Sequence, residues 1–376
     1  MKKIQMVDLK SQYEKIKDTI NASIQEVLDT NTYINGPEVQ KFQKNLEKYL
    51  GVKHVIPCAN GTDALQIAMM GLGLKPGDEV ITADFTFAAT VETIALLQLT
   101  PVLVDVDLYN MNINIDAIRK AITPKTKAII PVHLFGRAAN MEAIMHIANQ
   151  HNLFVIEDNA QAIGANCKFS DGTKKKAGTI GHVGATSFFP SKNLGCYGDG
   201  GAIFTNDDAL AHTLRGIVNH GMYERYHHDV VGVNSRLDSI QAAVLNAKLP
   251  LLDNYGKARQ DAARKYSVAF DGHKNIVAPT ICDICDCHVF HQYTLRIIDA
   301  DRNGLMQYLL DQGIPCAIYY PIPLHFQKAY VNSRYNEQDF PVTNQLVKEV
   351  LSLPMHTELD DEQIKFITDS VLKFLG

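Results

Sequence analysis

The sequence predicts an α/β protein with a mostly parallel central sheet and a smaller α+β domain at its C-terminal end. Short apolar runs alternate with helix-period segments as far as Thr205, which is typical of a parallel sheet whose strands are joined by helices. The pattern changes after Leu249, where a long helical segment rich in Ala, Lys and Arg begins. A chain of 376 residues has room for about two or three domains. We expect two, over residues 1–250 and 251–376.

The chain should begin with an arm of two helices. Apolar residues recur at steps of three and four between Leu9 and Thr30, which predicts an amphipathic helix there. The turn Asn35-Gly36-Pro37 interrupts this pattern, and a second helix is expected over 38–50. The periodic positions of the first helix are Leu9, Tyr13, Ile16, Ile20, Ile24, Val27 and Leu28.

Strands and helices then alternate through the large domain. Each expected strand is a short run rich in apolar residues, and each expected helix has an apolar stripe with a longer period. We expect strands at 55–58, 80–81, 102–106, 128–132, 154–156, 185–189 and 202–205. The helices should cover 64–72, 90–97, 116–121 and 141–151.

The C-terminal domain mixes helices and strands in a different order. A long helix is predicted over 253–270 and a closing helix over 362–375. Between them we expect a strand at 291–298, a helix at 303–312 and a second strand at 315–320.

Composition excludes several classes of protein. The chain has 36 Lys and Arg against 41 Asp and Glu, a net charge of −5, so no strong basic field exists to hold nucleic acid. The first residues lack the apolar core of a signal peptide, and no apolar stretch approaches the ~20 residues of a membrane span. Seven cysteines, an odd number, do not indicate a secreted disulfide framework. We therefore expect a cytoplasmic protein without a membrane segment.

Three short segments carry residues suited to chemistry. The run Phe154–Gln161 delivers the carboxylate of Asp158 at the carboxyl end of a strand, where open α/β sheets bind ligands. A structural role for Asp158 as a helix N-cap is the alternative. The run Ser187–Lys192 places a lysine in a turn between two buried strands. Such a lysine loses its proton easily and suits a Schiff-base nucleophile, although most lysines are solvated surface charges.

The third segment is Asn60-Gly61-Thr62, which opens a helix. Free N–H groups at a helix start can hold a phosphate, but Thr62 is an equally good N-cap. Neither G-x-G-x-x-G nor G-x-x-x-x-G-K-[ST] is present at the expected places, so dinucleotide and P-loop sites are disfavoured. Together the three segments offer a phosphate cradle, an amine and a carboxylate, the groups that pyridoxal phosphate requires.

The sequence resembles the DegT/DnrJ/EryC1/StrS family of sugar-nucleotide aminotransferases, which have the aspartate-aminotransferase fold (fold type I). The similarity extends from about Val7 to Leu372. It is carried by five motifs in order: Tyr33-Ile34-Asn35-Gly36-Pro37-Glu38, Asn60-Gly61-Thr62-Asp63-Ala64-Leu65, Glu157-Asp158-Asn159-Ala160-Gln161, Ser187-Phe188-Phe189-Pro190-Ser191-Lys192 and Gly232-Val233-Asn234-Ser235-Arg236.

The resemblance implies a pyridoxal 5'-phosphate enzyme that acts as a homodimer with shared active sites. Lys192 would bind the cofactor aldehyde and act as the base, as expected for an aminotransferase, whereas dehydratase relatives have His there. Asp158 would pair with the pyridine nitrogen, Gln161 with the 3-hydroxyl, and Phe87 would stack on the ring. The phosphate would be held by Gly61, Thr62 and Ser187 and by Asn234 from the partner subunit.

The resemblance also indicates the substrates. Within the family, the sequence most resembles the aminotransferases that act on UDP-2-acetamido-2-deoxy-3-oxo-glucuronate. These enzymes use L-glutamate as the amino donor and supply sugars for surface polysaccharide and lipopolysaccharide. Arg225, Arg236, Tyr320 and His325 are the expected substrate contacts. Arg236 could bind the sugar carboxylate bidentately or form an interface ion pair. Tyr319-Tyr320 departs from the His-Tyr of that branch, so a dTDP-3-keto- or 4-keto-6-deoxyhexose stays open as substrate, as does a non-catalytic regulatory role.

Two further groups of residues have structural alternatives. His227 and His228 could be substrate contacts or loop surface residues. Cys282, Cys285, Cys287 and His288 have zinc-like spacing, but structural zinc sites draw their second ligand pair from a separate element, so we expect no metal. The other cysteines are interpreted as small buried hydrophobes. They are Cys58, Cys167, Cys196 and Cys316.

Overall fold

A seven-stranded sheet forms the centre of the large α/β part of the chain. The computed structural model describes residues 2–281 and 287–376. The strand order is β1-β9-β8-β5-β4-β2-β3, and β9 alone runs antiparallel to its neighbours. The expected mostly parallel sheet is thereby confirmed. Its strands are β1 (His54–Cys58), β2 (Glu79–Ala83), β3 (Thr100–Val104), β4 (Thr126–Ile130), β5 (Phe154–Asp158), β8 (Val183–Ser187) and β9 (Gly201–Thr205).

Helices cover both faces of this sheet, which explains why most residues of its strands are apolar. In β4, Ile129 packs into the core beneath α5 (Ile115–Ala121) and α6 (Met141–His151). Its neighbours Ala128 and Ile130 pack into the core on the opposite face. That second face is covered by α3 (Gly61–Gly71), α4 (Ala89–Leu96) and α7 (Asp208–Ile217). A strand buried on both faces has no polar alternation.

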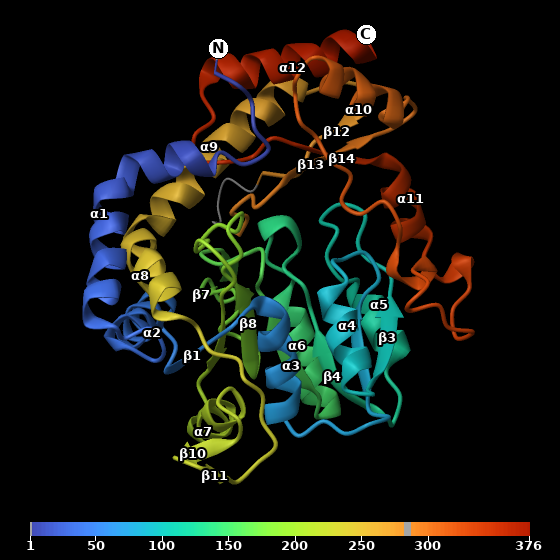
Figure 1. The fold of residues 1–376 in the computed structure, drawn as a ribbon. Coiled ribbons are helices and arrows are strands. Elements are labelled where there is room, and N and C mark those ends of the chain that lie inside the picture. Colours follow the sequence, from blue (N-terminus) through green and yellow to red (C-terminus); the bar gives the residue numbers. More distant parts are fainter. Residues whose placement is uncertain (1, 282–286) are drawn as a thin grey trace.

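The N-terminal arm packs beside one edge of the sheet. Its helices α1 (Leu9–Thr30) and α2 (Pro37–Leu50) lie against α8 (Ser239–Lys248), as Figure 1 shows on the left. Asp8 caps α1 by accepting a hydrogen bond from Ser11 N–H at 2.9 Å, and Pro37 begins α2, where no N–H is needed.

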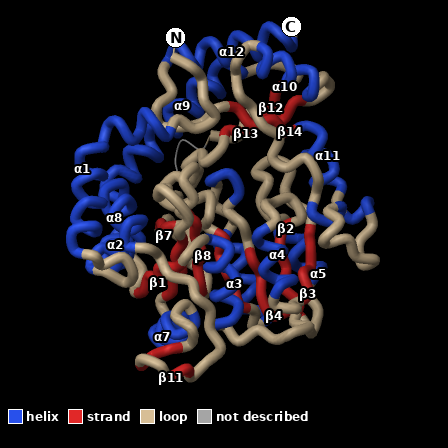
Figure 2. Tube along the Cα trace, viewed as in Figure 1, coloured by secondary structure: helices blue, strands red, loops and turns tan. Residues whose placement is uncertain are grey.

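The C-terminal part has its own three-stranded antiparallel sheet. Its order is β12 (Ile276–Val277), β13 (Tyr293–Ile297) and β14 (Val350–Leu353). Figure 2 shows this sheet above the large one, with loops between them. The helices of this part are α9 (Leu252–Phe270), α10 (Arg302–Asp311), α11 (Pro341–Glu349) and α12 (Asp361–Leu375). The division at residue 250 stays a prediction.

The first residues of the chain join this C-terminal core. Ile4 is 4% exposed and belongs to the same buried cluster as Val371 of α12. Met355 N–H donates to the Met6 carbonyl at 3.2 Å. The two ends of the chain consequently lie at the same end of the molecule (Figure 1).

Short elements complete the described structure. Two hairpins extend from the large part: β6 (Asn166–Lys168) with β7 (Lys174–Lys176), and β10 (Met222–Glu224) with β11 (His227–His228). Four single turns of 3-10 helix occur at η1 (Leu134–Gly136), η2 (Leu249–Leu251), η3 (Leu324–Phe326) and η4 (Glu337–Asp339). In the described residues, no helix combines the length and apolar composition that crossing a bilayer requires.

One predicted element is wrong. Residues 315–320 do not form a strand, because only Ala317 pairs, as an isolated bridge to Ser352 of β14. Pro315 has no N–H to donate, so it weakens any ladder at this edge. The chain beyond Ala317 then leaves the sheet and carries Tyr319 and Tyr320 to the cavity described below.

Candidate active site

The backbone of Asp158 is held on both sides at the carboxyl end of β5. Asp158 N–H donates to the Pro131 carbonyl at 2.9 Å, and His133 N–H donates to the Asp158 carbonyl at 3.0 Å. On the other side, Asn159 N–H donates to the Ala185 carbonyl of β8 at 2.7 Å. The Asp158 side chain therefore starts from a backbone position set by two neighbouring strands.

The preceding carboxylate, Glu157, anchors the same strand end. Ala139 N–H donates to His133 Nδ1 at 3.0 Å, so Nε2 carries the ring hydrogen and donates to Glu157 Oε2 at 2.9 Å. Both side chains are fully buried. Three backbone N–H groups satisfy the rest of the carboxylate, at 2.6–2.8 Å, from Gly178, Ile180 and Gly181.

The carboxylate of Asp158 is buried and receives two hydrogen bonds. Thr90 Oγ1 donates to Oδ2 at 2.8 Å, and Ala160 N–H donates to Oδ1 at 3.1 Å. Burial raises the pKa of Asp158, and these hydrogen bonds oppose the rise. No helix follows Asp158 directly, so the N-cap alternative for this residue is wrong.

Lys192 lies in a tight turn after β8. Lys192 N–H donates to the Phe189 carbonyl at 2.8 Å, and Phe189 N–H donates to Ser187 Oγ at 3.2 Å. Burial lowers the pKa of Lys192 to about 8, while the nearby Asp158 carboxylate works in the opposite direction. The turn therefore presents an amine that gives up its proton more readily than an ordinary lysine.

One cavity of about 660 Å³ brings these groups together. Its walls come from the start of α3, the segment after β2, the end of β5, the Lys192 turn and two segments of the C-terminal part. Eight of the predicted site residues line it: Gly61, Thr62, Phe87, Asp158, Gln161, Ser187, Lys192 and Tyr320.

The end of the cavity at α3 has the form of an anion cradle. Asn60 caps the helix by accepting from Asp63 N–H at 2.8 Å, so the alternative that Thr62 is the N-cap is wrong. Thr62 is left on the cavity wall. A Cβ added to Gly61 would lie 2.6 Å from Ser187 Cβ, so glycine is required for this close approach. A helix start with free N–H groups beside two hydroxyls suits a phosphate.

Aromatic rings form another part of the cavity wall. The Phe87 side chain is 59% exposed, and its ring centroid lies 6.3 Å from that of Tyr320. Tyr320 Oη accepts from Gln161 Nε2 at 3.2 Å, and Gln161 Oε1 accepts from Phe135 N–H at 2.6 Å. Gln161 thus holds Tyr320, and its predicted bond to a cofactor hydroxyl stays a prediction.

Four predicted site residues do not line this cavity within the single chain. Asn234 and Arg225 are exposed, and Arg225 lies over the ring of Tyr226 at 5.0 Å. Arg236 has a buried Nε atom that has no partner in the described residues. His325 is buried against Asp84 of the segment after β2. Their predicted roles as cofactor or substrate contacts stay predictions.

The other singled-out residues that the structure describes do not line the cavity. His227 and His228 are exposed on β11, and His228 Nδ1 lies 2.8 Å from the His220 carbonyl. Cys282 and Cys285 are outside the described residues. Burial raises the pKa values of Cys196 and Cys316 to about 11. Both thiols therefore stay protonated, as expected for small buried side chains.

Sequence reasoning missed three residues of the site: Thr90, His291 and Gln292. His291 and Gln292 precede β13 and line the cavity. Burial, with the charges of Lys192 and Arg259, holds the pKa of His291 far below its usual range. The sequence places His291 and Gln292 at the start of a predicted strand. It does not show that this end of the strand packs against Lys192.

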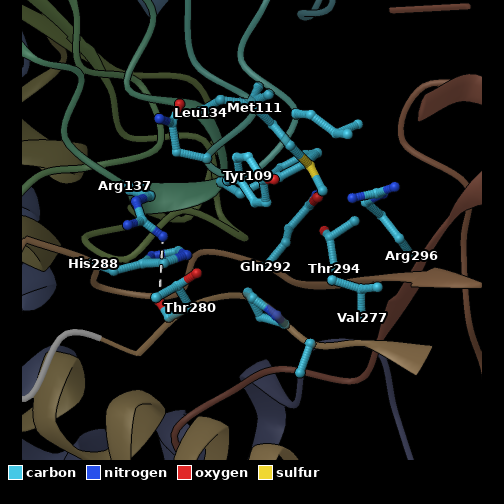
Figure 3. Close-up of a pocket in the computed structure, with 15 residues that line it drawn as sticks. Tyr109, Met111, Leu134, Arg137, Val277, Thr280, His288, Gln292, Thr294 and Arg296 are labelled. Atoms are coloured by element: carbon cyan, nitrogen blue, oxygen red, sulfur yellow. Dashed lines mark hydrogen bonds between the residues drawn. The ribbon is translucent and has the colours of Figure 1, made fainter. Parts of the chain in front are cut away.

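A second cavity, shown in Figure 3, shares Gln292 with the first. Arg137 points toward Thr280 and donates from Nη1 to its carbonyl at 3.2 Å. Arg296 Nε donates to Glu349 Oε2 at 2.8 Å. Protein acceptors thus engage both guanidinium groups, and Lys192 does not line this cavity.

The residues of the main cavity fit pyridoxal phosphate. The start of α3 with Thr62 and the Ser187 hydroxyl can hold a phosphate, the Lys192 amine can bind an aldehyde, and the Asp158 carboxylate can face a ring nitrogen. Fold and site together define a fold type I enzyme that depends on pyridoxal phosphate. Residues 14–372 match the sequence model of the DegT/DnrJ/EryC1/StrS aminotransferase family, and the chain belongs to this family.

Curated relatives agree with this membership. A UDP-2-acetamido-2-deoxy-3-oxo-D-glucuronate aminotransferase of Pseudomonas aeruginosa is 47% identical over 97% of this chain and 98% of its own. A UDP-N-acetyl-3-dehydro-alpha-D-glucosamine 3-aminotransferase of Acidithiobacillus ferrooxidans is 43% identical over 99% and 98%. A pleiotropic regulatory protein of Geobacillus stearothermophilus is 44% identical over 99% and 98%.

Solved structures show the same fold. A DegT DnrJ EryC1 StrS aminotransferase from Brucella abortus is 43% identical, with a TM-score of 0.93 over 99% of this chain and 100% of the other. NtdA from Bacillus subtilis, solved with bound cofactor PMP, is 31% identical, with a TM-score of 0.88 over 96% and 82%. The chain is a sugar aminotransferase, and its cofactor is pyridoxal phosphate.

Proposed function

We propose that this enzyme transfers the amino group of L-glutamate to a 3-keto UDP-sugar, UDP-2-acetamido-2-deoxy-3-oxo-D-glucuronate. The position of Lys192 carries the proposal, since its amine lines one cavity with Asp158 and has a pKa of about 8. The names of the relatives at 47% and 43% identity support a 3-oxo UDP-sugar as the acceptor.

Each cavity residue has one task in this reaction. When bound, pyridoxal phosphate supplies an aldehyde that exchanges amino groups and a ring that takes up electrons from the substrate carbon. Lys192 Nζ removes the Cα proton of glutamate and later delivers a proton to C3 of the sugar. Asp158 accepts the hydrogen bond of the ring nitrogen, and Phe87 packs on the ring. Gly61, Thr62 and Ser187 hold the phosphate.

The two half-reactions share one base. Glutamate binds first and leaves as the 2-oxo acid, after which the keto sugar takes the amine in the same cavity. We also propose Arg236 as the contact for the sugar carboxylate, because its buried Nε lacks a partner in the described residues and a guanidinium binds carboxylates bidentately. The remaining proposed substrate contacts are Tyr320, Arg225 and His325.

We further propose a cytoplasmic homodimer that supplies amino sugars for surface polysaccharide, including lipopolysaccharide. In this dimer Asn234 of the partner subunit contacts the phosphate. The exposure of Asn234 in the single chain supports this arrangement, since its side chain is available to a second copy. The prediction can be tested by mixing two inactive variants.

Product mass from a glutamate-dependent assay tests the reaction. The enzyme should aminate UDP-2-acetamido-2-deoxy-3-oxo-D-glucuronate faster than dTDP-3-keto- or 4-keto-6-deoxyhexoses. Lys192→Ala and Lys192→Arg should abolish turnover, whereas Lys127→Ala, on an exposed lysine of β4, should not. A faster reaction with a dTDP sugar would favour the alternative substrate. No glutamate-dependent amination of any sugar would favour a regulatory role.

A subunit-mixing experiment tests the shared site. Lys192→Ala and Asn234→Ala homodimers should each be inactive. Random mixing should restore about a quarter of the parent activity, because each hybrid dimer contains one intact site. Full activity of Asn234→Ala, or no recovery on mixing, would contradict the shared site.

A further inference from the structure

Thr90 approaches the carboxylate of Asp158 from a separate element. It lies in the first turn of α4 and is 1% exposed. Its Oγ1 donates to Asp158 Oδ2 at 2.8 Å across 68 residues of sequence. The direction of the bond follows from chemistry, since an ionised carboxylate only accepts.

The two oxygens of Asp158 have one donor each within the described residues. Ala160 N–H serves Oδ1 from the residues just after β5, whereas the Thr90 hydroxyl serves Oδ2. The Ala160 donor is backbone and local to the strand end. Thr90 is the donor that a substitution can remove, and it ties the carboxylate to the helix beside Phe87.

The electrostatics of the site make this hydroxyl important. Burial alone favours the neutral acid, and a neutral Asp158 would not hold a proton on the ring nitrogen of the cofactor. The charge of Lys192 also favours the ionised form, but only while that amine is protonated. The two hydrogen-bond donors favour the ionised form whether or not that amine is protonated.

We propose that Thr90 is a positioning residue, whose hydroxyl keeps the Asp158 carboxylate ionised and directed at the pyridine nitrogen of the cofactor. This inference rests on the proposed role of Asp158. It predicts that loss of the hydroxyl weakens cofactor binding and lowers the protonation of that nitrogen, although Thr90 itself does not line the cavity.

The test is a set of variants loaded with pyridoxal phosphate that carries ¹⁵N in its ring. Thr90→Val keeps the shape of the side chain and removes the hydroxyl. We expect the dissociation constant for pyridoxal phosphate to rise about tenfold. The ¹⁵N resonance should shift toward the value of a ring whose nitrogen is unprotonated. Thr90→Ser should restore both values to those of the parent. If Thr90→Val fails to fold, Thr90→Ala gives the same readouts.

Two controls separate the possible failures. Thr93→Val makes the same change on the same helix, where the hydroxyl donates only to the carbonyls of Ala89 and Thr90, and should leave both readouts unchanged. Asp158→Asn should shift both readouts strongly. If it does so while Thr90→Val matches the parent, the inference about Thr90 is overturned and the proposed function stands. If Asp158→Asn has no effect, the role of Asp158 fails and the inference with it.

Discussion

His325 Nδ1 lies 2.6 Å from Asp84 Oδ2, and the two side chains are 2% and 0% exposed. The backbone N–H of His325 donates to the other oxygen of the same carboxylate at 2.8 Å. Burial raises the pKa of Asp84 to about 6, and the hydrogen bonds from His325 oppose that rise. This pair fastens the segment that carries Tyr320 to the end of β2, directly before Phe85 and Phe87.

A double-mutant cycle tests this pair. His325→Phe keeps a ring against Phe340, whose centroid lies 4.4 Å away, but leaves the Asp84 carboxylate with one donor fewer. We expect it to lower the free energy of unfolding by about 3 kcal/mol, measured in urea. Adding Asp84→Asn should recover part of the loss, because the unpaired buried charge disappears. Strictly additive losses would contradict a coupled pair.

Two lysines with a lowered pKa should differ in reactivity. The pKa values of Lys192 and Lys248 are each lowered to about 8 by burial. About half of such an amine is neutral at pH 8, against less than about 1% of an ordinary lysine. Lys192 lines the open cavity, whereas Lys248 is 1% exposed and donates to the Gly195 carbonyl.

Trace acetylation of the cofactor-free protein, followed by mass spectrometry, checks this difference. Lys192 should react faster than exposed lysines at pH 8, and Lys248 should stay unmodified. Pyridoxal phosphate should protect Lys192. Equal labelling of Lys192 and exposed lysines would show that its amine is not activated.

Two glycines offer a matched pair of alanine substitutions. Gly61→Ala should weaken cofactor binding by about tenfold or more, because its Cβ would meet Ser187 Cβ at 2.6 Å at the proposed phosphate site. Gly256→Ala places its Cβ 3.9 Å from Val289 in the interior of α9. It should raise the free energy of unfolding by about 0.5–1 kcal/mol and leave cofactor affinity unchanged. Fluorescence titration with pyridoxal phosphate and urea unfolding distinguish the two.

His356 should make the protein sensitive to acid. It is 3% exposed, and burial and the charge of Arg259 lower its pKa to about 4 from the ordinary 6.5. Between pH 6.5 and pH 4, His356 is therefore protonated in the unfolded chain but neutral in the folded state. The stability that is present above pH 6.5 is lost as the pH falls toward 4. At pH 5 the loss from this residue is about 2 kcal/mol.

Urea unfolding at pH 7.5 and pH 5 measures this loss. His356→Gln should reduce the difference between the two pH values by about that amount. His151→Gln, at an exposed position in the last turn of α6, should leave the difference unchanged. The remaining difference reflects other buried groups, including His288, whose pKa is lowered to about 3.

Local sequence signals predicted most of the large sheet and the centre of the site. The helices over 9–30 and 141–151 are confirmed to the residue, because amphipathic periods end there at left-handed caps, Asn31 and Asn152. Asp158 could be proposed because it ends an apolar strand, and Lys192 because it lies in the turn that follows the next strand of the sheet. Helix α8 was missed because Ala242, Ala243, Val244 and Leu245 are all buried, which leaves no polar face to reveal its period.

Contacts between distant segments were beyond local reasoning. Thr90 is one of many threonines until α4 is placed over the end of β5. His291 and Gln292 become cavity residues only because β13 begins beside the Lys192 turn. The strand predicted at 315–320 failed for the same reason, since Tyr319 and Tyr320 line the cavity instead of pairing in a sheet.

The packing of Ile4 into the C-terminal core has a consequence for how the protein is made. All strands of the large sheet lie before residue 206, so that sheet can assemble while the ribosome is still translating the rest of the chain. The hydrogen bond between Met355 N–H and the Met6 carbonyl can form only after almost the whole chain has been synthesised. We therefore expect the segment around Ile4 to stay unpaired through most of translation, and its docking to be among the last steps of folding.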